Sequence, residues 1–120
     1  RERRRLLRVL PLTKLTERTI TDPDGLEDEL SAIRKRGYAA NDQENTQGLI
    51  GLAVPIRNPK GRVIAGLAVH APEARFPMTR ALSHVADLSA AAAELEEFFA
   101  EDLEGLQSAA SETAGLSAQT

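Results

Sequence analysis

The sequence lacks cysteine and tryptophan, and aromatic residues make up only 3% of its 120 residues. Without cysteine the chain has no disulfide framework, no thiolate nucleophile and no cysteine-ligated zinc site. Its two histidines, His70 and His84, form no cluster that could hold a catalytic metal, and we expect no cofactor. Hydrophobic residues nevertheless reach 42%, so a core must be built from Leu, Ile, Val and Ala.

The chain also has no surplus of positive charge and no long apolar run. Fifteen basic against eighteen acidic residues give a net charge of −3, which argues against broad binding of nucleic acid by this segment. No run approaches the roughly 20 apolar residues of a membrane helix, and the Arg-rich start leads into no signal-peptide core. We therefore expect a cytoplasmic protein that binds no membrane. Because the sequence also lacks a phosphate-binding glycine loop and a nucleophile elbow, we expect it not to be an enzyme.

Three segments have the pattern of helices. Residues 1–10 place leucines among arginines and end at Pro11, which cannot continue a helix. Residues 22–36 begin with Asp22 as a capping residue and Pro23 in the first turn, and Gly37 follows as a left-handed stop. Residues 79–99 carry a broad apolar stripe at helical spacing. Residues 107–120 are rich in Ser, Ala and Thr, and we expect a disordered tail there, after a domain at 1–106.

Between the second and third helices the sequence has the pattern of three strands. Residues 38–42 form a short strand, and residues 48–57 and 62–71 are rich in Ile, Val, Leu and Ala. The segment Asn58–Gly61 between the two longer strands has the composition of a turn, with Pro at its second position and Gly at its fourth. The predicted fold is therefore an α+β unit with an antiparallel sheet and flanking helices.

Alternation along this hairpin predicts one bulky face and one nearly bare face. Pairing Arg57 with Arg62 across the turn fixes a register in which small residues face one another. The bare face then holds three cross-strand pairs: Leu49 with His70, Gly51 with Ala68, and Ala53 with Gly66. The bulky face, which must pack on a helix, holds Ile50, Leu52, Val54 and Ile56 against Val69, Leu67, Ala65 and Val63.

The bare face has two interpretations. Small residues allow another backbone or an Ala-rich helix to approach closely, and residues 89–93 of the third helix have that composition. Alternatively, the bare face is the floor of a small-molecule pocket, with His70 as a polar group at one end. The pattern alone leaves both interpretations open.

The order and spacing of the motifs between Leu15 and Pro72 resemble the C-terminal effector-binding domain of the IclR family of transcription regulators. The resemblance is carried by Thr19–Asp22 before the second helix, Arg36–Ala39 after it, the loop that ends at Gly48, and the Ala53–Ile56 segment. It implies the C-terminal portion of a GAF-like domain, in which an antiparallel sheet with helices around it binds a small organic or aromatic acid. It also implies a homo-oligomer, a dimer or tetramer, that contacts DNA through a separate N-terminal winged helix-turn-helix absent from this sequence.

The resemblance further implies that ligand-binding residues occupy five positions, namely Asn41, Leu49, Gly51, Ala68 and His70. Many relatives have Asp in place of Asn41 and Ser in place of Ala68 and His70, so this pocket is expected to be less polar. His70 then becomes the main polar anchor for an acid larger or more apolar than one of two or three carbons. The competing hypothesis is a ligand-free oligomerisation module, in which a partner helix fills the bare face.

Overall fold

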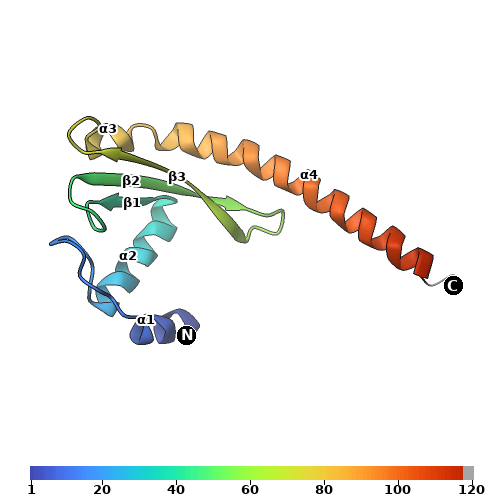
Figure 1. Cartoon of the computed structure of the whole chain (residues 1–120), viewed down its shortest axis with the longest axis horizontal. Coiled ribbons are helices and arrows are strands. Elements are labelled where there is room, and N and C mark those ends of the chain that lie inside the picture. Colours follow the sequence, from blue (N-terminus) through green and yellow to red (C-terminus); the bar gives the residue numbers. More distant parts are fainter. Residues whose placement is uncertain (118–120) are drawn as a thin grey trace.

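The computed structural model describes residues 1–117 and, within them, the side chains of all but 102–107 and 116–117. Its elements confirm the α+β class, with one three-stranded antiparallel sheet followed by a long helix (Figure 1). Along the chain these elements are α1 (Glu2–Val9), α2 (Pro23–Arg36), β1 (Ala39–Asp42), β2 (Leu49–Arg57), β3 (Val63–Pro72), α3 (Met78–Leu82) and α4 (Val85–Ser117). No helix in this part of the chain is long and apolar enough to cross a membrane.

Helix α2 begins and ends where the sequence predicted. The Asp22 carboxylate accepts a hydrogen bond from the Gly25 amide at 2.9 Å, and Pro23 occupies the first turn. Gly37 adopts φ 84°, a left-handed conformation that costs glycine little, and its amide donates to the Ile33 carbonyl. These caps fix the point at which the chain turns into β1.

The strand order is β1–β2–β3, but the predicted hairpin register is wrong by two residues over most of its length. Arg57 pairs with Val63 rather than Arg62, because the Asn58 amide donates to the Arg62 carbonyl and closes a five-residue loop. A bulge next to Arg57 adds the second residue of the shift, so that Gly51 pairs with His70. Because side chains alternate with period two, a shift of two residues leaves the face of each residue unchanged from Ala65 onward.

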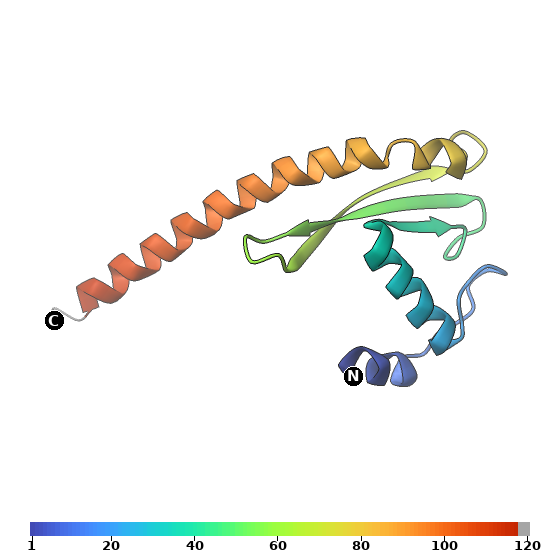
Figure 2. The same ribbon diagram turned by 180° about the vertical axis from the view of Figure 1, so that it is seen from behind.

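Helices α3 and α4 lie along the bulky face of the sheet (Figures 1 and 2). Alternate residues of β2 are buried there, with Ile50 and Leu52 each only 2% exposed. The Ala-rich part of α4 packs on this face too, because Ala92 contacts Val54 and Ile56. The idea that this helix covers the bare face is therefore wrong.

The β3 half of the bulky face is not covered as predicted. Val69, the cross-strand partner of Leu52, remains 42% exposed, and Val63 is 57% exposed. The core is thus centred on β2, and β3 forms one open edge of the sheet within the described part of the chain.

The third predicted helix, at 79–99, is two helices. The chain turns at Ser83 and His84, where the Ser83 hydroxyl donates to the Arg80 carbonyl at 2.6 Å and closes α3. Helix α4 then continues past Phe99 to Ser117, over most of the segment that composition predicted to be disordered. Ala, Leu and Glu, all good helix formers, recur between residues 100 and 117. Residues 118–120 lie outside the described residues.

Candidate functional site

A single cross-strand row on the bare face brings together three of the predicted site residues. Asn41 of β1 pairs with Gly51 of β2, and Gly51 pairs with His70 of β3. Adjacent strands lie about 4.8 Å apart, so the two polar side chains flank a glycine that has no side chain. The row therefore has a polar side chain at each end and a glycine, which leaves room for a neighbouring side chain, in the middle.

The next row on the same face consists of alanine alone. Ala39 pairs with Ala53, and Ala53 pairs with Ala68. The two rows together form a shallow pocket of about 100 Å³, lined by Ala39, Ala40, Asn41, Gly51, Leu52, Ala53, Ala68 and His70. The surface that lines this pocket is apolar, and the side chains of Asn41 and His70 stand at one end of it with the alanines at the other.

Gly51 determines where the His70 ring can lie. A Cβ atom built on Gly51 would be 2.8 Å from Nδ1 and 3.0 Å from Cε1 of His70, closer than real Cβ contacts. The third nearest atom, the Val69 carbonyl oxygen, would be at an ordinary 3.6 Å. The imidazole therefore lies directly over Gly51, and any larger residue at that position would displace it.

Asn41 is held by the loop that follows β1. Its side-chain oxygen accepts a hydrogen bond from the Glu44 amide at 2.9 Å, which leaves the NH2 group as the part that can donate to a ligand. The connector before α2 fixes this loop, because the Thr16 hydroxyl donates to the Gln43 carbonyl and the Thr19 hydroxyl to the Glu44 carbonyl. These threonines account for the Thr-rich motif that precedes α2 in the sequence.

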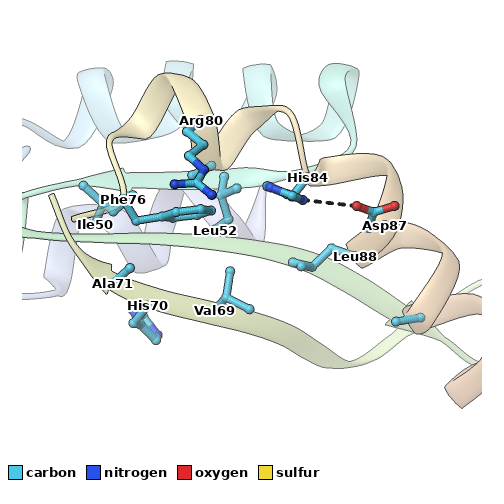
Figure 3. Close-up of a pocket in the computed structure, with 12 residues that line it drawn as sticks. Ile50, Leu52, Val69, His70, Ala71, Phe76, Arg80, His84, Asp87 and Leu88 are labelled. Atoms are coloured by element: carbon cyan, nitrogen blue, oxygen red, sulfur yellow. Dashed lines mark hydrogen bonds and ion pairs between the residues drawn. The ribbon is translucent and has the colours of Figure 1, made fainter.

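A second hollow lies on the opposite side of β3. It is an apolar cleft of about 510 Å³ between the bulky face and α3–α4, with Phe76, Arg80 and His84 along its rim (Figure 3). Figure 3 shows Val69 directed toward this cleft and His70 directed away from it. The side chains of consecutive residues of β3 thus point to opposite sides of the sheet.

The sequence matches one known family over most of its length. Residues 1–97 match the family described as bacterial transcriptional regulator IclR C-terminal. The chain belongs to the IclR family. Among curated members it is 39% identical over 100 residues to the probable transcriptional regulator SauR of Cupriavidus necator, covering 83% of this chain and 40% of SauR.

Solved IclR structures have the same fold. The C-terminal domain of the E. coli regulator KdgR superposes with a TM-score of 0.74 at 34% identity, covering 82% of this chain and 60% of that domain. The inducer-binding domain of a double mutant of PobR from Acinetobacter, solved with 3-hydroxybenzoic acid, gives a TM-score of 0.73 at 30% identity, covering 77% of this chain and 53% of that domain. The chain therefore corresponds to part of the C-terminal domain of IclR regulators and spans less than half the length of SauR.

Four of the five site residues predicted for this IclR-type domain line the same pocket. Leu49, the fifth, does not line it and pairs with Pro72 at the start of β2. The analysis of the sequence did not select Ala39 and Ala53, although Ala53 lay on the predicted bare face. Ala39 could not be found, because the loop between β1 and β2 contains no turn motif that fixes their register.

The acidic loop beside Asn41 provides a pH-dependent test of the site's scaffold. Burial, with Glu29 and Asp42 nearby, holds the pKa of Glu44 above its ordinary value of 4.5. The folded state therefore binds a proton at Glu44 more tightly than the unfolded chain does. The protonated carboxyl contributes its full stability below the unfolded pKa, and this contribution is lost as pH rises through the folded pKa. We expect Glu44→Gln to raise the melting temperature at neutral pH, with a difference that shrinks toward about pH 4.

The matched control for Glu44→Gln is Glu101→Gln, which removes the same charge from an exposed position on α4. Its effect on melting temperature should be small and should not vary with pH in the same way. Equal pH profiles for the two variants would mean that Glu44 has no special environment.

Proposed function

We propose that this chain forms the sensing face of a cytoplasmic transcription regulator and binds a small organic or aromatic acid. The observation that carries the proposal is the row Asn41–Gly51–His70 beside a row of three alanines. DNA contact would come from a separate domain, in line with the net charge of −3 on this one.

The two rows suggest how an acid would lie on this face. Its carboxylate would sit beside the His70 ring, which lies over Gly51, and would accept from a ring N–H and from the NH2 group of Asn41. Its apolar body would extend over the alanines, which offer contact area but no hydrogen-bond partners. This arrangement favours an aromatic acid over one of two carbons, since only the former covers the alanine row.

Two further observations support sensing rather than catalysis. The similar PobR domain was solved with 3-hydroxybenzoic acid, an acid of the kind this face suits. Among the residues that line the described pocket, His70 has no carboxylate, thiol or hydroxyl neighbour to make a nucleophile–base pair. We therefore infer that the chain binds its ligand without transforming it.

A thermal-shift titration with 3-hydroxybenzoate, benzoate and acetate tests the proposal. A ligand that binds only the folded state adds about 2.7 kcal/mol of stability at 100 times its dissociation constant. We expect a saturable rise in melting temperature with the aromatic acids and a much weaker one with acetate. Because a hydrogen bond to a charged group contributes about 1.5–3 kcal/mol, His70→Ala should weaken binding about 10- to 100-fold.

The second histidine provides the matched control. His84 lies on the opposite side of the sheet, where its ring bonds to Asp87 at 3.1 Å, so His84→Ala should leave the titration unchanged. If no acid shifts the melting temperature of the folded chain, sensing by this segment is wrong. The ligand-free oligomerisation module is the second candidate, favoured by the small residues of the bare face, against which a partner helix could pack closely.

A further inference from the structure

The connector between α1 and α2, residues 11–21, contains no helix or strand, yet two partly buried threonines order it. The Thr19 hydroxyl oxygen accepts hydrogen bonds from the amides of Leu15 at 3.1 Å and Thr16 at 2.9 Å. The Thr16 hydroxyl oxygen accepts one from the amide of Arg18 at 3.1 Å. Both oxygens thus accept within the connector, and each hydroxyl has one proton left to donate elsewhere.

Both of these protons go to the loop that follows β1. The Thr16 hydroxyl donates to the Gln43 carbonyl at 2.6 Å, and the Thr19 hydroxyl donates to the Glu44 carbonyl. Gln43 adopts φ 62°, a left-handed conformation that is unfavourable for a residue with a side chain, so this loop needs outside contacts to keep its shape. The two threonines supply such contacts across 27 and 25 residues of sequence.

Glu44 joins this contact to the sensing face. Its carbonyl accepts from Thr19, and its amide donates to the side-chain oxygen of Asn41 at 2.9 Å. An asparagine amide can present either its oxygen or its NH2 group, and only the NH2 group can donate to a carboxylate. Because the Glu44 N–H occupies the oxygen, the position of the Glu44 backbone decides which group of Asn41 remains for a ligand.

We propose that Thr16 and Thr19 are positioning residues of the sensing face, which set the orientation of the Asn41 amide through Gln43 and Glu44. Neither threonine lines the pocket of about 100 Å³, so both act without touching the ligand. The part of this proposal that concerns an acid rests on the proposed function, whereas the orientation of Asn41 is a property of the free chain.

Acid binding in turn affects the connector. If the threonines hold Asn41 in the orientation that binds a carboxylate, a bound carboxylate favours the closed connector by the same factor. The ion pair between Arg18 and Asp42, at 2.7 Å, also joins the connector to β1, but both side chains are exposed and the pair contributes little in water. The hydroxyl bonds therefore carry the coupling, and a bound acid should slow hydrogen exchange at the two connector amides that bond to Thr19.

Replacing Thr19 with valine removes the hydroxyl and keeps the shape of the side chain. In NMR spectra of the chain without acid, we expect the Glu44 amide and the Asn41 NH2 group to change their shifts, and the Glu44 amide to exchange about 3- to 10-fold faster. Thr19→Ser, which retains the hydroxyl, should keep both signals of the natural chain. Unchanged Asn41 and Glu44 signals in a folded Thr19→Val protein overturn the proposal.

Thr13→Val is the matched control, because Thr13 is an exposed threonine of the same connector with no side-chain bond among the described residues. It should leave the signals of Asn41 and Glu44 unchanged. If Thr19→Val does not fold, Thr16→Val tests the same point through the Gln43 carbonyl, with the same two signals as the measurement.

A titration with 3-hydroxybenzoate tests the consequence for binding. Thr19→Val should weaken binding about 3- to 10-fold, whereas Thr19→Ser and Thr13→Val should bind like the natural chain. In an Asn41→Ala background Thr19→Val should cause no further loss, because the threonine acts only through that amide. An undiminished loss in this background, or equal affinity of Thr19→Val and the natural chain, contradicts the proposal. If the natural chain binds no acid, the proposed function fails, and the NMR comparison alone decides whether the threonines orient Asn41.

Discussion

Replacing Leu52 with alanine is expected to lower the free energy of unfolding by about 2–5 kcal/mol. Leu52 is 2% exposed and lies in a cluster with Ile50 and Ala81, covered by Tyr38, Met78, Val85 and Leu88. The total free energy of unfolding of a small domain is about 5–15 kcal/mol. In the described core, β2 is the strand that the helices cover. The substitution should therefore remove a large share of the stability, measured as a lower urea midpoint with an unchanged slope.

Val69 provides the matched control for Leu52→Ala, because it is the cross-strand partner of Leu52 on the same face. It is 42% exposed, so Val69→Ala should cost less than about 1 kcal/mol at concentrations low enough to keep the chain monomeric. Equal costs for Leu52→Ala and Val69→Ala in the monomer would contradict a core centred on β2.

Local chemistry made the boundaries of α2 and the two faces of the hairpin predictable. Asp22, Pro23 and Gly37 act within one helical turn of their own positions, so their effect can be derived without knowing the fold. The two faces were predictable for a similar reason, because a register shift of two residues does not change the face of the sheet on which a side chain lies. This is why a register wrong by two residues still placed Gly51 and His70 on one face.

The remaining features depend on contacts distant in sequence. The bulge beside Arg57 and the five-residue loop closed by Asn58 have no distinct sequence motif, so the pairing of Gly51 with His70 rather than Ala68 could not be predicted. The apolar pattern of β3 is similar to that of β2, yet β2 is largely buried and most of β3 stays exposed. Which strand a helix covers is decided by tertiary packing, which a periodic pattern does not encode.

Replacing Gly51 with alanine is expected to weaken acid binding about as much as His70→Ala does, roughly 10- to 100-fold. The added Cβ atom would meet the His70 ring at 2.8 Å, so the imidazole must leave its position over the pocket floor. Alanine itself is tolerated in a strand, so the fold should remain. In the double variant the loss should be no greater than in either single variant, because both remove the same contact.

Stability gives a second and independent signature of the same contact. In the natural background Gly51→Ala should destabilise the chain, since the His70 ring has to rotate away from its contact with the Gly51 backbone. In a His70→Ala background the nearest remaining atom is the Val69 carbonyl at 3.6 Å, and the substitution should be neutral or stabilising by up to about 1 kcal/mol. Urea unfolding of the four proteins measures this reversal of sign. Additive effects would mean that Gly51 and His70 do not touch, and the polar end of the proposed pocket would then need another explanation.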